Sequence, residues 1–131
     1  IGAETNYNVN LDAPRIIQLT QQELNTLYYK EDQEPHGHLY AFYDPKTDTV
    51  FLNKDFDIHD PFHKGVLLHE LIHYVQDNND VVGPNKPFEC VRAMEEEAYP
   101  LQKKYMLEVH GVNWKYDELW VKLLSSCDEL Y

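Results

Sequence analysis

The sequence predicts a single α+β domain in which a short β-hairpin or small sheet packs on two long helices. Its 131 residues match the usual size of one domain, and its 43% hydrophobic content is that of a globular protein. Two runs of aromatic and β-branched residues flank a run of turn formers, which favours a hairpin. Two longer segments in the second half carry apolar residues at helical spacing. Strands grouped in a hairpin, with helices grouped after them, indicate the α+β class.

The first elements are an arm and a strand. Residues 1–13 are polar and rich in turn formers, which predicts an extended arm of the single domain over residues 1–131. Residues 15–19 are rich in β-branched side chains and predict a strand. The amino terminus has neither an initiator Met nor a basic-then-apolar signal pattern, so we expect a chain that has been trimmed.

A short helix and the hairpin follow. Thr20 and Glu23 have the spacing of a capping box, which predicts a helix from there to about residue 30. Residues 39–43 and 49–52 are the aromatic and β-branched runs that form the predicted hairpin.

Three segments of the second half are predicted to be helical. Asp60 supplies an N-cap and Pro61 the first helical position of a helix that runs to about residue 76. A second long helix is expected over residues 88–108, and a third over residues 117–126.

The charge balance excludes two classes of partner. The chain has 23 Asp and Glu against 11 Lys and Arg, a net charge of −12. Such a field repels phosphate backbones and anionic lipid, so we expect no nucleic-acid partner and no membrane partner. No apolar run approaches the ~18 residues that a membrane-spanning helix needs.

The two cysteines, Cys90 and Cys127, allow one disulfide, which would persist only in an oxidising compartment. The alternative is a pair of buried free thiols. The processed-looking start and the ten tyrosines favour export. We therefore predict a disulfide in a secreted or periplasmic protein.

An HExxH motif at residues 69–73 carries the chemistry. His69 and His73 lie one turn apart on one face of the predicted helix, so both imidazoles can coordinate one zinc ion. Glu70 can reach a zinc-bound water without being a ligand and would serve as the general base. Zinc would lower the pKa of that water to about 7 and polarise the substrate carbonyl.

The surroundings of the motif strengthen this interpretation. Most flanking residues are apolar, so the helix is expected to be buried. Two imidazoles and a carboxylate buried without partners would cost several kcal/mol, and a metal ion removes that cost. The alternative is a set of core histidines that backbone groups or carboxylates satisfy. His36 and His38 form a separate HxH pattern, which we interpret as part of a polar loop.

A zinc site needs a third protein ligand. The extended motif HExxHxxGxxH is excluded, because Gln76 and Asn79 stand where it requires Gly and His. A glutamate on a later helix is the other common solution, and Glu95, Glu96 and Glu97 follow after a loop. Successive helical residues point ~100° apart, so one of the three can face the metal and two are expected on a solvated face.

With these features, residues 39–107 resemble the gluzincin group of zinc metallopeptidases in its smallest, zincin-like form. Members often show the pattern Glu-x-x-Ala-Asp/Asn on the second helix. On this chain the pattern selects Glu95 as the ligand, followed by Ala98 and by Tyr99 in place of Asp or Asn. In the group, that acidic or amide residue orients a zinc-bound His, a role that would fall here to Tyr99 or Asp77.

The resemblance also implies a substrate cleft. In such enzymes an extended substrate pairs with the strand beside the motif helix. That strand would be residues 49–52 or the first strand of the hairpin, with Tyr40, Tyr43 or Phe51 near the cleft.

Related enzymes also use a Tyr or His from downstream of the motif to stabilise the oxyanion of the tetrahedral intermediate. Tyr99, Tyr105 and His110 are the candidates here, and Tyr99 is our prediction.

The sequence thus predicts a zinc metallopeptidase that hydrolyses a peptide or protein substrate. Zinc (Zn2+) would be held by His69, His73 and Glu95, with Glu70 and Tyr99 as catalytic residues. One alternative is a noncatalytic, zinc-stabilised protein-binding domain of zincin fold, and another is a binding domain without metal. Glu70 favours the enzyme, because a structural zinc site needs no general base.

Overall fold

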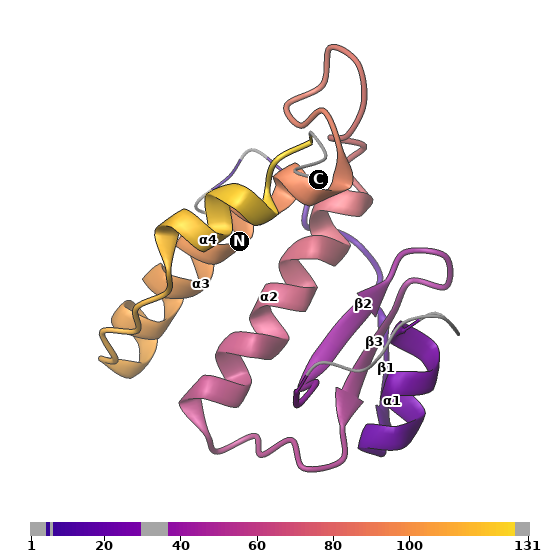
Figure 1. Ribbon diagram of the computed structural model, residues 1–131, viewed down its shortest axis with the longest axis vertical. Coiled ribbons are helices and arrows are strands. Elements are labelled where there is room, and N and C mark those ends of the chain that lie inside the picture. Colours follow the sequence, from indigo (N-terminus) through magenta and orange to yellow (C-terminus); the bar gives the residue numbers. More distant parts are fainter. Residues whose placement is uncertain (1–4, 6, 30–36, 128–131) are drawn as a thin grey trace.

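The fold is α+β, as predicted, in the computed structural model of the chain (Figure 1), which describes residues 5, 7–29 and 37–127. Over these residues it contains a three-stranded mixed sheet, four α-helices and one 3-10 turn. None of the described helices has the length and apolar composition that crossing a membrane requires. The expectations for the trimmed amino terminus and for His36 lie outside the described residues.

The sheet has the strand order β1-β3-β2. β2 (Ala41–Asp44) and β3 (Thr49–Asn53) form the predicted antiparallel hairpin, with Phe42 opposite Phe51. β1 (Arg15–Leu19) spans the predicted residues and runs parallel to β3. β3 is therefore the central strand, and β2 is an edge strand.

α1 (Gln21–Tyr28) begins at the predicted capping box, in which the Thr20 side chain accepts from the backbone of Glu23 and the Glu23 side chain accepts from the backbone of Thr20. Its Leu24 is fully buried. Figure 1 shows α1 on the side of the sheet that faces away from the long helix α2.

α2 (Pro61–Asp77) carries the HExxH motif and covers the other side of the sheet. As predicted, it begins after Asp60, whose carboxylate accepts a hydrogen bond from the backbone N–H of Phe62 (2.8 Å). The core between α2 and the sheet consists of Ala41, Val50 and Leu52, with Tyr43, Phe56, Val66, Leu67 and Leu71 packed around them. This packing holds the motif beside β2.

The second long helix begins later than predicted. The 3-10 turn η1 (Val91–Met94) precedes α3 (Glu95–His110), so a start at residue 88 is wrong. Phe88 instead forms a bridge with Val82, and the residues between them form a turn and bends. The delayed start makes Glu95 the first residue of α3.

α3 runs antiparallel to α2, as its contacts show: Gln76 meets Met94 near one end, and Gly65 meets Met106 near the other. A Cβ atom at Gly65 would lie 2.7 Å from Sδ of Met106, so a larger residue here would require the Met106 side chain to shift.

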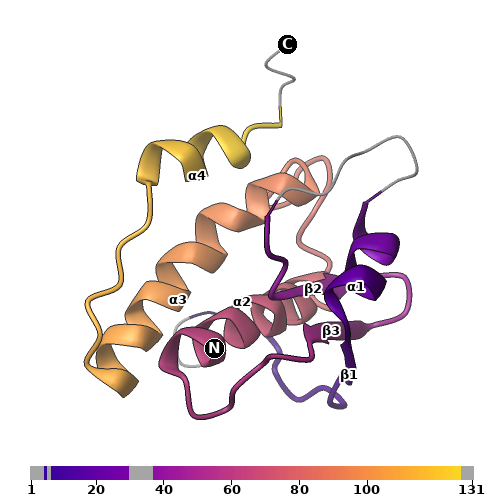
Figure 2. The same ribbon diagram turned by 60° about the horizontal axis from the view of Figure 1, so that its bottom comes forward.

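α4 (Glu118–Leu124) packs on α3 and is capped by Asp117, close to the predicted bounds. Figure 2 shows it beside α3. Cys90 and Cys127 form the predicted disulfide, with 5.8 Å between their Cα atoms. Nε of Arg92 also donates to the carbonyl oxygen of Leu124 (3.0 Å). These links fix α4 beside η1 and the start of α3.

Removing the disulfide is expected to destabilise the fold. Replacing Cys90 and Cys127 together by Ser should lower the free energy of unfolding by about 2–4 kcal/mol, because the unfolded chain regains the entropy of an open loop. Urea denaturation of the oxidised protein and of the double variant measures the difference. Equal stabilities would show that the bridge does not constrain the domain.

Candidate metal centre

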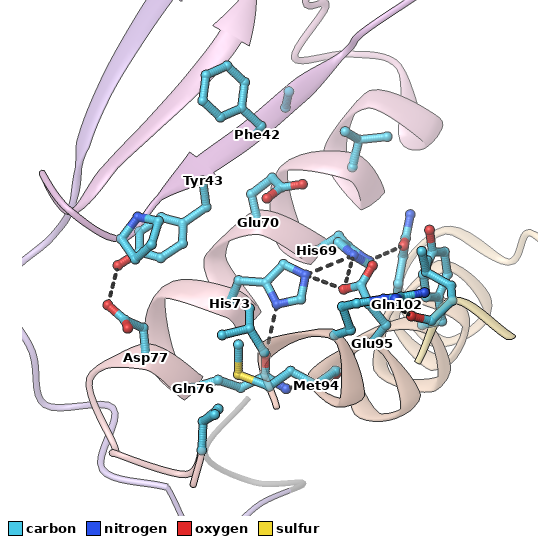
Figure 3. Close-up of a pocket in the computed structure, with 18 of the residues that line it drawn as sticks. Phe42, Tyr43, His69, Glu70, His73, Gln76, Asp77, Met94, Glu95 and Gln102 are labelled. Atoms are coloured by element: carbon cyan, nitrogen blue, oxygen red, sulfur yellow. Dashed lines mark hydrogen bonds and ion pairs between the residues drawn. The ribbon is translucent and has the colours of Figure 1, made fainter. Parts of the chain in front are cut away.

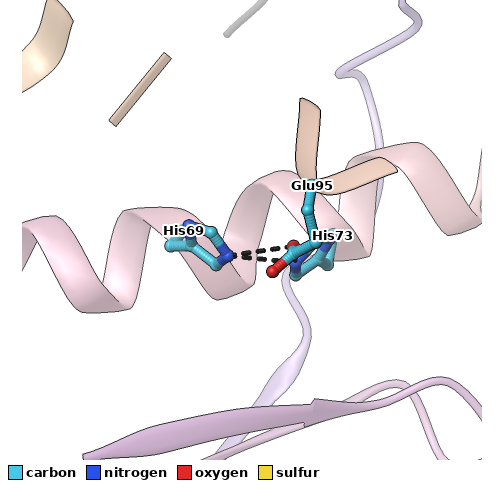
Figure 4. Close-up of side chains that lie close together, drawn as sticks. All are labelled: His69, His73 and Glu95. Atoms are coloured by element: carbon cyan, nitrogen blue, oxygen red, sulfur yellow. Dashed lines mark hydrogen bonds and ion pairs between the residues drawn. The ribbon is translucent and has the colours of Figure 1, made fainter. Parts of the chain in front are cut away.

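His69, His73 and Glu95 each bring one ligand atom to a common point (Figure 4). Nε2 of His69 lies 3.2 Å from Nε2 of His73 and 3.1 Å from Oε1 of Glu95. The same Glu95 oxygen is in direct contact with Nε2 of His73. Ligands at the corners of a tetrahedron with metal bonds of about 2.0–2.1 Å lie about 3.3 Å apart, so the two distances from Nε2 of His69 fit a zinc-sized ion.

The three glutamates of α3 have separate environments. Glu95 faces the two imidazoles, whereas Glu96 is exposed. Oε1 of Glu97 accepts hydrogen bonds from Tyr7 and Gln76, and Glu97 does not belong to the group of candidate ligands. The expectation of a solvated face is therefore right for Glu96 and wrong for Glu97.

Each imidazole is held by a glutamine through its second nitrogen. Nδ1 of His69 donates to Oε1 of Gln102 (2.9 Å), and Nδ1 of His73 donates to Oε1 of Gln76 (2.8 Å). Both glutamines are buried, with 3% and 0% of their surface exposed, respectively. With the hydrogen on Nδ1, each Nε2 keeps its lone pair for a metal.

Neither residue expected to orient the histidines does so. Asp77 lies at the end of α2 and accepts from the hydroxyl of Tyr43 (2.8 Å), which joins the helix to the hairpin. Tyr99 packs its ring against that of His69, with 4.6 Å between the ring centroids. The Nδ1 atoms point instead toward the α2–α3 contact, where the two glutamines lie.

The charges of His73 and Glu95 affect each other's pKa. Burial alone would raise the pKa of Glu95, but hydrogen bonds from His69 and His73 outweigh it and lower the pKa to about 2. Burial opposes charge on His73 as well, yet the hydrogen bond to Glu95 and the nearby carboxylates raise its pKa to about 9. Without metal, His73 is therefore a cation paired with Glu95 at neutral pH.

Metal binding is expected to release a proton. At pH 7, below the His73 pKa of about 9, the metal must displace the proton on this imidazole. Zinc binding should release about one proton, and the apparent affinity should rise about tenfold per pH unit from pH 6 to pH 8. Calorimetric titration in buffers of different ionisation enthalpy measures the release. A binding enthalpy that does not depend on the buffer would contradict this prediction.

The group opens into a cavity of about 710 Å³ (Figure 3). One wall comes from β2, α2 and Tyr28 of α1, and the other comes from η1, α3, Trp114 and Trp120. Of the aromatic residues expected near the cleft, Tyr43 lines this cavity, whereas Tyr40 and Phe51 lie outside its lining.

Glu70 lies in the same cavity, on the sheet side of the imidazoles, while Glu95 approaches them from α3 (Figure 3). Burial raises the pKa of Glu70, and the charges of His73 and His69 and a backbone hydrogen bond from Tyr43 oppose that rise. This carboxylate therefore stands between the edge strand and the candidate ligands without being one of them.

Besides Tyr43, two tyrosines line the cavity, and of these two Tyr99 was predicted and Tyr28 was not. Tyr99 lines it, and burial together with the charges of Glu95 and Glu70 raises the Tyr99 pKa to about 12, so the hydroxyl keeps its proton. Tyr28 also lines the cavity, with its ring centroid 5.3 Å from that of Phe42. Burial raises the pKa of Tyr28 too, with contributions from Tyr29, Glu70 and Glu95.

The other two candidates for the oxyanion role are placed elsewhere. Tyr105 and His110 form a hydrogen bond of 3.0 Å with each other near the end of α3, and neither lines the cavity.

Comparison with known proteins gives one match. A family model described as a domain of unknown function, DUF6647, matches residues 1–130. No curated protein and no solved structure matches the chain. The match covers nearly the whole domain, including every residue of the candidate metal centre.

Proposed function

Because the chain belongs to the DUF6647 family, whose description names no activity, we propose from the site itself that it is a zinc-dependent metallopeptidase that hydrolyses peptide bonds. One observation carries this proposal. The convergent group of His69, His73 and Glu95 shares a single cavity with Glu70, a carboxylate that lies beside the group and does not belong to it.

The donor set favours zinc over other common metals. Two imidazole nitrogens and one carboxylate oxygen are a set that catalytic zinc uses, with the fourth position left for water or substrate. Calcium and magnesium prefer sites made of oxygen ligands alone. The glutamine partners of the two imidazoles support the same assignment, because they leave both Nε2 atoms free to bind.

Zinc bound here would polarise the scissile carbonyl and lower the pKa of a bound water to about 7. Glu70 then takes the proton of the attacking water and passes it to the leaving amine. Partial burial suits this residue to both steps, because its raised pKa lets the carboxyl group hold a proton between them.

Tyr99 and Tyr28 supply hydrogen-bond donors to the oxygen on which negative charge develops. Both hydroxyls stay protonated at neutral pH, because burial and the nearby carboxylates raise the pKa of each. Tyr99 approaches from α3 and Tyr28 from α1, so the two act from opposite walls of the cavity.

The substrate backbone is assigned to the edge of β2. β3 lies between β1 and β2, which excludes residues 49–52 as the strand that receives a substrate. Ala41, Phe42 and Tyr43 of β2 line the cavity, and among the described strands β2 has one side without a partner. An extended peptide that pairs with this side lies across Glu70 and the candidate ligands.

The disulfide supports a place of action outside the reducing cytosol. Cys90 and Cys127 are bonded in the structure, and such a bond persists in oxidising compartments. We therefore include a secreted or periplasmic location in the proposal.

The test combines metal analysis with digestion of a peptide library. The purified protein should contain one zinc per chain and should cleave members of the library. A chelator should stop cleavage, and added zinc should restore it. Protein that neither retains zinc nor cleaves any peptide would overturn the proposal. Protein that retains zinc without cleavage would favour the noncatalytic, zinc-stabilised binding domain.

A further inference from the structure

Residues 7–12 of the amino-terminal arm lie against the end of α2 that carries His73. The backbone N–H of Asn8 donates to Oδ1 of Asn79 (2.8 Å), and Nδ2 of Asn79 donates to the carbonyl oxygen of Asn8 (3.0 Å). The hydroxyl of Tyr74 also donates to the carbonyl oxygen of Asp12. The arm is therefore fixed to α2 through Tyr74 and to the turn after α2 through Asn79.

A chain of hydrogen bonds leads from this arm to the candidate metal centre. The hydroxyl of Tyr7 donates to Oε1 of Glu97 (2.6 Å). The same oxygen accepts from Nε2 of Gln76 (3.0 Å). Oε1 of Gln76 in turn accepts from Nδ1 of His73 (2.8 Å). Every link joins two side chains, and only Gln76 and His73 come from the same helix.

Glu97 decides which way the Gln76 amide faces. A carboxylate can only accept, so it requires the NH₂ group of Gln76 on its side and leaves the amide oxygen for His73. Nε2 also donates to the carbonyl oxygen of Met94 (3.2 Å), the residue before Glu95. Because Gln76 is fully buried, a flipped amide would face two acceptors with its oxygen and find no water to compensate.

In this series of hydrogen bonds, the Tyr7 hydroxyl acts as the donor to Glu97. Burial and the hydrogen bond to Glu97 raise the pKa of its hydroxyl, so it remains protonated at neutral pH. The Glu97 carboxylate thus has a donor from the arm on one side and a donor from α2 on the other.

We propose that Gln76 is a positioning residue for His73 and that Tyr7 and Glu97 hold it, so that docking of the amino-terminal arm and binding of the metal strengthen each other. This inference rests on the metal site of the proposed function and goes beyond it, since it makes the arm part of that site. Coupling of this kind is reciprocal: the arm raises metal affinity by the factor by which metal tightens the arm.

The first test measures zinc affinity by competition with a chelator. Gln76→Met keeps the length of the side chain and removes its acceptor, and zinc affinity should fall about 10–100-fold. Tyr7→Phe removes one hydroxyl outside the ligand set, and the affinity should fall about 3–10-fold. Tyr105→Phe removes a hydroxyl that bonds His110 far from the metal centre, so it serves as the matched control and should bind zinc like the wild type.

The second test reads the coupling from the arm. Hydrogen exchange of the Asn8 amide should slow when zinc binds the wild type, and the slowing should be much smaller in Gln76→Met and Tyr7→Phe. A purely structural arm would show the same exchange with and without zinc. In metal-free protein above the His73 pKa of about 9, where this imidazole is neutral, long-range proton–nitrogen NMR spectra should show its hydrogen on Nδ1 in the wild type and no such preference in Gln76→Met.

The outcomes separate this inference from the proposed function. A wild type that binds zinc, together with a Tyr7→Phe variant of equal affinity and unchanged exchange, would overturn the coupling and leave the peptidase proposal intact. A wild type that binds no zinc would overturn both. Tyr7→Phe changes one hydroxyl at the edge of the domain, so the test does not depend on whether Gln76→Met folds.

Discussion

Replacing Glu95 by Gln is expected to abolish tight zinc binding. Glu95 provides the only carboxylate among the three candidate ligands of the described structure, and its oxygen contacts both imidazoles. A neutral amide is a weaker ligand and leaves the metal charge less compensated. The loss should therefore exceed the ~10–100-fold that removal of an outer hydrogen-bond partner costs. Chelator competition and metal content after dialysis measure it.

Glu96→Gln is the matched control, because it makes the same substitution at the next residue, on the exposed side of α3. It should bind zinc like the wild type. A Glu95→Gln variant that keeps one zinc per chain would contradict the assignment of the third ligand. Loss of zinc in both variants would point to damage at the start of α3 instead of loss of a ligand.

Local signals account for the elements that the sequence predicts well. The capping box at Thr20 and Glu23 and the Asp60-Pro61 start of α2 act within a few residues, and both stand where expected. The hairpin follows for the same reason, because its turn and its two strands are contiguous. Such features need no knowledge of the tertiary structure.

Two features that depend on contacts between distant segments could not be predicted from the sequence. The parallel alignment of β1 with β3 joins segments more than 30 residues apart, and no turn connects them directly. Helical periodicity also failed at the start of α3, because the bridge between Val82 and Phe88 and the disulfide at Cys90 hold that segment out of the helix. At the start of α3, tertiary contacts therefore overrode local propensity.

The residues of the candidate site also differ in whether a local sequence signal predicts them. His69, Glu70 and His73 follow from a contiguous motif, whereas Glu95 followed only from a resemblance. The position of Gln102 could have been noticed in the sequence. It stands four residues from each of the buried residues Ala98 and Met106, on a helix face where an apolar side chain is expected.

Tyr28 and Tyr7 gave no such signal. Tyr28 ends a short helix on the far side of the sheet, and Tyr7 lies in an arm without regular secondary structure. Their contacts with Phe42 and Glu97 depend on how distant segments pack, so the structure was needed to find them.

Glu70→Gln is expected to remove catalysis while leaving the metal in place. Gln keeps the size of the side chain and can still form hydrogen bonds, but it cannot take a proton from the attacking water. General acid–base assistance contributes ~10²–10⁴-fold, so peptide cleavage should fall by at least about 100-fold. Zinc content should stay at the wild-type level, because Glu70 lies outside the group of candidate ligands.

The fold should tolerate this change, because the neutral amide removes a carboxylate whose pKa burial already raises. Thermal unfolding of the zinc-loaded variant checks that point, and Glu96→Gln again controls for the loss of one negative charge. Wild-type cleavage by Glu70→Gln would rule out this residue as the base. If the variant and the wild type both retain zinc but neither cleaves any peptide in a broad library, the results favour the noncatalytic binding domain over the peptidase. The metal would then stabilise the fold without taking part in catalysis.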